Sequence, residues 1–486
     1  MPETELANIT GSENVTDDAE ALGNYAKDFS FVPRIRPSYI VKVNKADKVQ
    51  ELIKWANKTR TPLVPVSSGP PHFRGGTVPG SGGAVIADLS GMKQIMRTDR
   101  RNRVAMIEAG VTFSELIPEL AKVGLRLNPP LLPRQSKSVI GSALDREPVI
   151  MPLYQWDAID PLSCIEVVFG SGDLFRTGSA AGPGTLEQQW ASKQAQSSPM
   201  GPGQTDFARV VQGSQGTMGI VTWATVRCEA IPTLQKPFLA GANKLENLTD
   251  FIYRLLWLKL GDEILILNNT DLAAILATTP AEYSAIRDSL PQWLLFFCLS
   301  GFEYFPEERV KYQEKEMGEA ARQFGVAPVN AIAGISAHEL LKTLARPSEE
   351  PYWKLRYKGA CQDIFFLTAM NRAPGFVSIM HDLARQHGYS SLDIGTYIQP
   401  MVQGTSCHCE FNLFYDPNNA SEVSRVRELY THAGEAFLNN GAFFSRPYGT
   451  MADLVYRRDA ETYTALRKVK SIFDPNNIMN PGKLCF

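Results

Sequence analysis

The sequence predicts an α+β fold divided into two domains, and three observations predict it. The chain has 486 residues, which is more than one hydrophobic core usually organises. In the first half, short apolar runs of strand type alternate with amphipathic helical segments. Beyond residue 232 the pattern changes, and longer helical segments alternate with strands as far as about residue 440. We therefore expect two packed units, each with its own core.

The elements of the first half follow from hydrophobic spacing and turn residues. Residues 1–35, rich in Glu, Asp, Asn and Thr, predict a poorly packed arm. Residues 45–58 carry apolar side chains at helical spacing, and Thr112 with Glu115 forms a capping box that starts a helix over 112–123. Apolar runs around a turn at 170–173 predict a hairpin. Further strands are predicted at 39–43, 64–66, 84–89 and 104–109.

The second half contains long helical patterns and several apolar strands. Before it, residues 182–206 are rich in Gly, Pro, Gln and Ser, which favours an excursion without regular structure. Helices are predicted at 306–324 and 451–473, and strands at 263–267, 293–300 and 406–415.

Composition and charge exclude several classes of function. A net charge of −2 with 21% charged residues and no basic stripe argues against a nucleic-acid partner. No window holds the roughly eighteen apolar residues that a membrane helix needs. The amino-terminal residues lack the basic start and apolar centre of a secretory signal, and the seven cysteines are scattered, which favours free thiols. We therefore expect a protein of the cytoplasm, without a membrane partner.

Three segments rich in small residues mark a candidate nucleotide site. They cover residues 65–88, 138–145 and 213–221, and each adjoins an apolar run. Glycine allows close approach and positive φ, proline stiffens the turn, and oriented N–H groups suit a pyrophosphate. Three such loops indicate a large dinucleotide that is contacted on several sides. The residues predicted to contact it are Pro65, Ser67, Ser68, Gly69, Pro70, Pro71, His72, Ser138, Gly141, Ser142, Gly216, Gly219, Ile220 and Val221.

At these segments the chain resembles the flavoproteins of the vanillyl-alcohol oxidase and p-cresol methylhydroxylase type. The resemblance runs in order through residues 64–115, 138–178 and 213–232, and ends with Asp-Pro-Asn-Asn-Ile-Met-Asn-Pro-Gly-Lys at 474–483. It covers both ends of the chain well and the middle poorly. It implies FAD as the cofactor, a PCMH-type FAD-binding fold, and a second α+β domain that covers the substrate.

The resemblance also implies a division of the chain. We expect an arm at 1–35, an FAD-binding domain at 36–235, a substrate cap at 236–445 and a segment 446–486 that returns to the FAD-binding domain. In that last segment, Asn480 and Lys483 are the expected cofactor contacts.

Two arginines point to a negatively charged substrate. In the resembling phenol oxidases the pyrophosphate loop supplies a tyrosine that holds the phenolate, and Arg74 stands at that position. The family's second Tyr-Arg pair corresponds to Ser445 and Arg446, with Tyr448 two positions on. Arginine offers a planar fork that suits a carboxylate or a phosphate. The alternatives are that Arg74 contacts the pyrophosphate or a surface acid, and that Arg446 forms a structural salt bridge.

The predicted strand at 406–415 carries polar and apolar residues in alternation. Strand geometry places His408 and Glu410 on one face and the two neighbouring cysteines on the other. In the resembling 2-hydroxy acid dehydrogenases this strand helps to hold a divalent metal, but only His408 matches that pattern, and two ligands make a poor site. We therefore expect no metal, and a role for His408 as acid, base or hydrogen-bond donor beside the flavin. The alternative is a core histidine whose hydrogen bond goes to Glu410.

The resemblance bears on how the FAD is attached. Some relatives tether it through a histidine of the cap, and Asp363 stands where that histidine would be. His72, in the pyrophosphate loop, is the other candidate. We expect non-covalent FAD.

The predicted function is FAD-dependent oxidation by hydride transfer from an alcohol or benzylic carbon of a small anionic or aromatic substrate, such as a hydroxy acid. Arg74, His408, Glu410, Arg446 and Tyr448 are the predicted catalytic residues. The alternative is a 4-alkylphenol or aryl-alcohol oxidase or hydroxylase of the vanillyl-alcohol oxidase type, followed by an FAD-containing transferase or a flavin-binding protein without catalysis. The electron acceptor could be oxygen, a cytochrome or an electron-transfer flavoprotein, and we expect a homo-oligomer.

Overall fold

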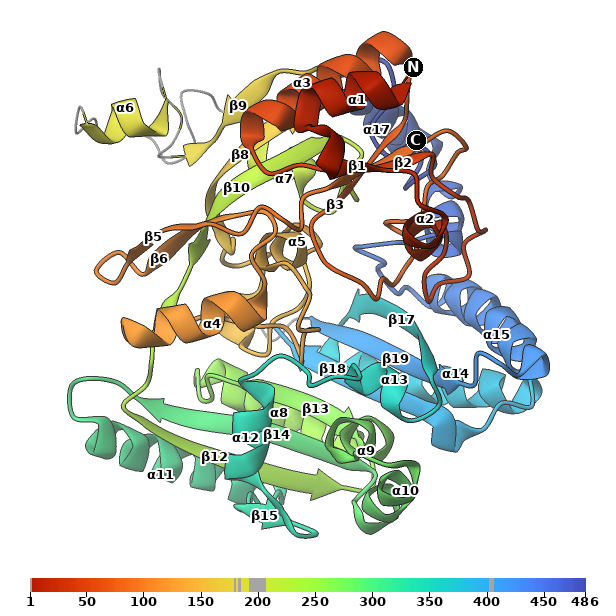
Figure 1. Cartoon of the computed structure of the whole chain (residues 1–486). Helices are drawn as coiled ribbons and strands as arrows, with labels where there is room; N and C mark the ends of the chain where they lie inside the picture. The colour runs from red at the N-terminus through yellow and green to blue at the C-terminus, as the bar shows by residue number, and fades with distance from the viewer. Residues whose placement is uncertain (1, 179–180, 182–184, 192–206, 402–405) are drawn as a thin grey trace.

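The computed structural model describes residues 2–178, 181, 185–191, 207–401 and 406–486 (Figure 1). Two sheets from the first half of the chain form one part, and a six-stranded sheet from the second half forms the other. The predicted α+β class with two packed units is therefore confirmed. Among the described helices, none has both the length and the apolar character needed to cross a bilayer.

The first sheet carries the longest small-residue loop. Its strand order is β1 (Val15–Thr16), β2 (Tyr39–Lys42), β4 (Val85–Asp88) and β3 (Leu63–Val66), with β2, β3 and β4 parallel. The crossover from β2 to β3 is α3 (Ala46–Thr59), whose buried face includes Val49, Leu52 and Ile53 as its periodicity predicts. The connection from β3 to β4 is the predicted nucleotide loop.

The second sheet is antiparallel and has five strands. Their order is β5 (Ile95–Asp99), β6 (Val104–Glu108), β10 (Gly219–Arg227), β8 (Leu162–Phe169) and β9 (Leu174–Arg176). The predicted hairpin is β8 with β9. Thr112 caps α4 (Phe113–Lys122), and Glu115 returns the bond to the Thr112 backbone, so the predicted capping box is present. Shorter elements of this part are β7 (Leu125–Arg126), α5 (Val139–Leu144), α7 (Phe207–Val211) and β11 (Glu229–Ala230).

The six-stranded sheet is buried on both faces, which explains its continuous apolar strands. Its order is β12 (Leu234–Ala242), β14 (Trp293–Gly301), β13 (Ile264–Asn268), β18 (Ile394–Pro400), β19 (Cys407–Tyr415) and β17 (Ala360–Thr368). One face packs under α8 (Glu246–Trp257), α11 (Pro306–Phe324), α14 (Ala373–Gln386) and α15 (Ala420–Asn439). The other packs under α9 (Asn269–Leu276), α10 (Pro280–Ser289) and α12 (Ala337–Leu344). A short helix, α13 (Trp353–Arg356), precedes β17, and β15 (Ala331–Ile332) pairs with β16 (Ile335–Ser336).

The carboxyl-terminal segment returns to the first sheet, where Met479 pairs with Leu63. The single helix expected at 451–473 is wrong. The chain forms α16 (Thr450–Tyr456) and α17 (Ala460–Phe473), because Asp459 caps a new helix by accepting from the Glu461 and Thr462 amides.

The amino-terminal residues pack better than their composition predicts. They form α1 (Pro2–Thr10) and α2 (Ala19–Ala26), and the expectation of a poorly packed arm is wrong. Leu6 is 0% exposed in the core that includes β2 and α3. Trp55 of α3 donates from Nε1 to Glu5 at 2.7 Å. Of the excursion expected at 182–206, α6 (Leu186–Ala191) is helical, and the rest lies almost wholly outside the described residues.

Truncating Leu6 tests whether the amino-terminal helix belongs to the core. We expect Leu6→Ala to lower the free energy of unfolding by about 2–4 kcal/mol, because a fully buried leucine is lost and a cavity remains. Urea denaturation measures it, with the exposed-site variant Glu3→Ala as the control. Equal stability of the two variants would show that α1 does not contribute to the core.

Candidate active site

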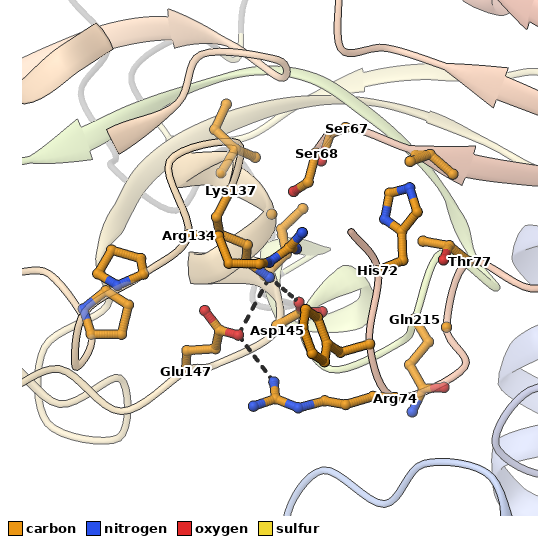
Figure 2. Close-up of a pocket in the computed structure, with 18 of the residues that line it drawn as sticks. Ser67, Ser68, His72, Arg74, Thr77, Arg134, Lys137, Asp145, Glu147 and Gln215 are labelled. Atoms are coloured by element: carbon orange, nitrogen blue, oxygen red, sulfur yellow. Dashed lines mark hydrogen bonds and ion pairs between the residues drawn. The ribbon is translucent and has the colours of Figure 1, made fainter. Parts of the chain in front are cut away.

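A cavity of about 240 Å³ is lined by residues of the first two sheets and of the six-stranded sheet, and Figure 2 shows part of its lining. All three small-residue segments reach it. The first contributes Pro65 to Ser68, the second Ile140 and Gly141, and the third Ser214 to Gly216. The opposite wall comes from the second half of the chain, with Tyr352, Trp353, Lys354, Asp363, Tyr397, Glu410 and Tyr448.

Asn480 holds two of these loops together. Its Nδ2 donates to the Gly76 carbonyl at 3.0 Å and to the Gln215 carbonyl at 2.8 Å. The loops approach so closely that a Cβ on Gly216 would lie 2.5 Å from Pro65 Cγ. Gly216 also has φ of 72°, which an L side chain rarely adopts, so this position requires glycine for two reasons.

The segment before Asn480 is a turn built around a buried carboxylate. Asp474 accepts hydrogen bonds from the Ile478 amide at 3.1 Å and the Met479 amide at 2.8 Å. Lys470 lies 2.5 Å from Asp474 Oδ2 and also donates to the Thr217 and Met479 carbonyls. This turn fixes the position of Asn480, and so explains the motif at 474–483.

The cavity wall presents polar atoms that suit a dinucleotide. Among the described residues of the first loop that line the cavity, His72 Nε2 and Thr77 Oγ1 are buried without a hydrogen-bond partner. Burial, followed by Arg134 and Lys137, lowers the pKa of His72 to about 3, so its ring is neutral. Buried polar atoms normally have partners, and a polar ligand in the cavity would supply them. These residues fit the phosphate and ribose portion of FAD.

The predicted cofactor contacts divide into two groups. Pro65, Ser67, Ser68, His72, Gly141, Gly216, Gly219, Ile220 and Val221 line the cavity. Gly69, Pro70, Pro71, Ser138, Ser142, Asn480 and Lys483 are not part of its lining.

Residues of the second group support the wall from behind. The Gly69 amide donates to the Ser136 carbonyl, and Ser138 donates to the Ala109 carbonyl at 2.5 Å while it caps α5. Ser142 donates to Glu147 Oε2 at 2.6 Å. Burial lowers the pKa of Lys483 to about 8.

Arg74 connects the two parts of the molecule. Its Nη1 lies 3.0 Å from Glu147 Oε1, and its Nη2 lies 3.4 Å from Asp363 Oδ2 on β17. Its backbone has φ of 68°, an uncommon conformation outside glycine that is found at functional sites. Both ends of the guanidinium are therefore already paired with carboxylates.

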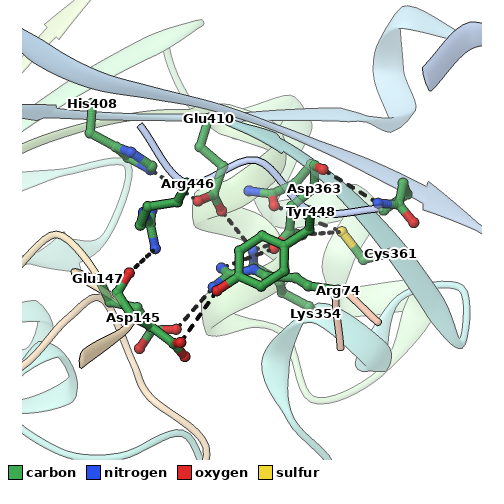
Figure 3. Close-up of polar contacts among 12 residues, drawn as sticks. Arg74, Asp145, Glu147, Lys354, Cys361, Asp363, His408, Glu410, Arg446 and Tyr448 are labelled. Atoms are coloured by element: carbon green, nitrogen blue, oxygen red, sulfur yellow. Dashed lines mark hydrogen bonds and ion pairs between the residues drawn. The ribbon is translucent and has the colours of Figure 1, made fainter. Parts of the chain in front are cut away.

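Arg446 lies beside Arg74 but makes different contacts (Figure 3). It is 4% exposed, donates from Nη1 to the Asp145 carbonyl at 3.3 Å, and stacks on Phe365 with its Cζ 4.4 Å from the ring centroid. Within the described ranges it forms no ion pair with a carboxylate. The Tyr448 hydroxyl donates to Asp145 Oδ1 at 3.3 Å, and burial raises the pKa of Tyr448, so the phenol stays protonated.

His408 and Glu410 extend from the same face of β19, as the alternation predicts. His408 Nε2 lies 3.0 Å from Glu410 Oε2, and both side chains are buried. Glu410 lines the cavity, whereas His408 stands behind it. Burial lowers the pKa of His408, against the opposing effect of Glu410. The neutral ring therefore donates from Nε2 to the Glu410 carboxylate. This is the alternative stated from the sequence, a core histidine whose hydrogen bond goes to Glu410.

Sequence reasoning missed five charged residues of this site, Lys354, Glu147, Lys137, Arg134 and Asp145. Lys354 on α13 is 4% exposed and contacts Asp363 and Glu410, while Glu147 pairs with Arg74 and with Lys137. A lysine inside the aromatic sequence Tyr-Trp-Lys was the only signal for Lys354. Nothing local distinguishes Glu147. In the described part of the chain, no group of three or more His, Cys, Asp or Glu side chains is placed to hold a metal ion.

The fold and the cavity define a two-part flavoprotein, and comparisons with known proteins agree. The FAD binding domain family matches residues 37–178, and the family of FAD linked oxidases, C-terminal domain, matches residues 266–484. The chain is 24% identical to the glycolate oxidase subunit GlcD of Bacillus subtilis, over 99% of this chain and 96% of the relative. It is 22% identical to the 4-cresol dehydrogenase [hydroxylating] flavoprotein subunit of Pseudomonas putida, over 98% and 93%.

A solved structure shows the same fold. The crystal structure of p-cresol methylhydroxylase with substrate bound superposes with a TM-score of 0.86 at 20% identity, over 100% of this chain and 96% of that one. The two parts of the chain match these two FAD-linked families, its fold is that of the PCMH-type flavoproteins, and it is an FAD-dependent oxidoreductase. The expected fold, family and cofactor are confirmed.

Removing the Asn480 side chain tests the arrangement of the loops. We expect Asn480→Ala to weaken FAD binding about 30-fold, because two hydrogen bonds of about 1 kcal/mol each hold the loops at their spacing. The ratio of flavin to protein absorbance after gel filtration measures the retained FAD. The exposed-site variant Asn418→Ala is the control, and equal retention by both variants would contradict this role of Asn480.

Asp271 is a buried carboxyl linked to the same strand as Glu410. Its Oδ2 accepts from Asn412 Nδ2 at 2.9 Å, while its Oδ1 has no partner among the described residues. Burial raises the pKa of Asp271 to about 8, against the hydrogen bond from Asn412. The folded protein therefore holds a proton there that the unfolded chain releases near pH 4.

The pH dependence of stability should reveal this proton. Because the folded pKa of Asp271 exceeds its unfolded pKa, the contribution of Asp271 to the free energy of unfolding falls as pH rises from about 4 through 8. We expect Asp271→Asn, which resembles the protonated carboxyl, to flatten this fall and to melt above the parent protein at pH 9. Melting temperatures across the pH range measure it, with the exposed Asp250→Asn as control. Parallel curves would contradict a protonated Asp271.

Proposed function

We propose that this protein oxidises a small anionic substrate, such as a hydroxy acid, by hydride transfer from the substrate carbon to FAD. In this proposal residues 36–235 and 446–486 hold the FAD, and residues 236–445 form the cap over the substrate. The observation that carries it is Arg446, a buried guanidinium without a carboxylate partner among the described residues, next to cavity-lining Tyr448 and Arg74. The similarity to a glycolate oxidase subunit supports the same substrate class.

The charges around the cavity favour an anion. The cations Arg74, Arg134, Lys137, Lys354 and Arg446 exceed by one the carboxylates Asp145, Glu147, Asp363 and Glu410, which lie beside them. His408 and Asp271 add no charge, because burial favours their neutral forms. An unpaired buried charge is costly. A substrate carboxylate at Arg446 would remove that cost.

Each residue has a distinct task in the proposed reaction. FAD, when bound, supplies the hydride acceptor. Arg446 holds the anionic group of the substrate, while Arg74, already paired with Glu147 and Asp363, closes the wall beside it. Glu410 lines the cavity and accepts from His408, so this pair is placed to take the hydroxyl proton as the hydride leaves.

The aromatic lining favours a second candidate, a 4-alkylphenol or aryl alcohol. Phe73, Tyr352, Trp353, Tyr397 and Tyr448 surround the cavity, and an arginine also stabilises a phenolate. The similarity to a 4-cresol dehydrogenase flavoprotein supports this class. An aromatic hydroxy acid would use both the aromatic wall and Arg446.

A substrate panel separates these candidates. Hydroxy acids, alkylphenols and aryl alcohols are added without oxygen, and loss of the oxidised flavin absorbance is followed. We expect reduction by an acid or an aromatic acid, and by plain phenols only under the second candidate. A flavin that no compound reduces would overturn oxidation and favour a transferase or a flavin-binding protein. Re-oxidation of the reduced protein by oxygen or a cytochrome then tests the acceptor, and light scattering tests the homo-oligomer.

Arg446 is the residue on which the anionic substrate depends. For the acid identified in the panel, we expect Arg446→Ala to lower kcat/KM about 100-fold, since charge-assisted hydrogen bonds contribute about 3 kcal/mol. Arg446→Lys should recover part of the loss. The exposed-site variant Arg457→Ala is the control. An unchanged kcat/KM for Arg446→Ala would exclude this residue from substrate binding.

A further inference from the structure

Lys354 occupies the centre of the charged wall of the cavity (Figure 3). It lies on α13, and the side chain is buried although it carries an ammonium. Its Nζ lies 2.6 Å from Glu410 Oε1 and 3.0 Å from Asp363 Oδ1. One nitrogen therefore bridges two carboxylates that come from adjacent strands, β17 and β19.

Each of these carboxylates uses its second oxygen to hold another site residue. Asp363 Oδ2 lies 3.4 Å from Arg74 Nη2, and Glu410 Oε2 lies 3.0 Å from His408 Nε2. Glu410 holds the hydrogen on His408 Nε2 most strongly while it is ionised, because a protonated carboxyl offers a weaker acceptor and a competing O–H donor. The orientation of Arg74 likewise depends on a charged Asp363. Lys354 is therefore linked to Arg74 through Asp363, and to His408 through Glu410.

The charge of Glu410 depends on this lysine. Burial by itself would raise the pKa of Glu410, but the Lys354 ammonium, followed by the His408 hydrogen bond, holds it well below its usual range. Without Lys354, Glu410 would have no cation within ion-pair distance among the described residues, and Asp363 would keep only Arg74. Two carboxylates in such a site share a proton rather than both ionise.

We propose that Lys354 is a positioning residue that keeps Asp363 and Glu410 ionised, and that it thereby fixes Arg74 and the His408 proton at the substrate wall. This inference deepens the proposed function, because Arg74 and His408 are residues to which that function assigns tasks. It requires no contact between Lys354 and the substrate.

The test compares Lys354→Met, which removes the charge at similar volume, with Lys354→Arg, which retains it. A matched control exists nearby, because Lys358 also bridges two carboxylates, Asp393 at 2.8 Å and Glu422 at 2.7 Å, but is 24% exposed. Water can replace that lysine, so Lys358→Met should leave both carboxylates ionised. Infrared spectra of the FAD-loaded proteins from pH 5 to 9 detect the carbonyl band of a protonated carboxyl.

At pH 7 we expect a protonated-carboxyl band in Lys354→Met that is absent from the parent protein, from Lys354→Arg and from Lys358→Met. A band that all these proteins share is not counted. In Lys354→Met, the pH at which the rate of flavin reduction rises should be about 2 pH units higher than in the parent protein. Lys354→Arg should show the same pH profile as the parent. Absence of the additional band in a folded Lys354→Met, or equal behaviour of the Arg and Met variants, would overturn the proposal.

Two further points keep the test decisive. If Lys354→Met does not fold, adding Glu410→Gln removes the excess negative charge, and this double variant should fold and lack the additional band. Its failure to fold would show that Lys354 acts through packing, which also overturns the proposal. The infrared result needs no substrate, so it stands even if the proposed substrate class is wrong.

Discussion

The junction between the two parts of the molecule is governed by the need to neutralise buried charge. A chain of alternating contacts runs from Lys137 through Glu147, Arg74, Asp363, Lys354 and Glu410 to His408, with separations of 2.6 to 3.4 Å. Each group in such a chain depends on its neighbours, because a buried charge that loses its partner is strongly destabilising. The chain therefore fixes how the six-stranded sheet meets the first part of the molecule.

Arg446 gains its importance from this chain. Arg74, Lys137 and Lys354 pair with carboxylates. Among the described residues, Arg134 hydrogen-bonds only to backbone carbonyls, and Arg446 contacts the Asp145 carbonyl and the ring of Phe365. Arg446 does not line the cavity itself, but it lies next to Tyr448 and Arg74, which do, and it adds a positive charge there. The electrostatics of the site follow from which arginines lack a carboxylate more than from how many arginines are present.

The sequence predicted the local features of this fold well and the distant ones poorly. The helix at 306–324 and the capping box at Thr112 and Glu115 were correct, because hydrophobic spacing and a cap are determined within a few residues. The arm was wrong, because Leu6 is buried by β2 and α3, which lie far along the chain. The helix at 451–473 was wrong, because a cap at Asp459 overrides a continuous pattern.

The amino-acid sequence by itself determined the family, the FAD cofactor and the three small-residue loops, because these depend on motifs that stay in order along the chain. Only the tertiary structure decided which polar residues meet. Asn480 joins loops more than 260 residues away in sequence, and Lys354 lies between carboxylates of two strands. The pairing of Arg74 with two carboxylates, and the lack of an ion pair at Arg446 among the described residues, follow from that packing, since the charge state of a buried group depends on the neighbours that replace water around it.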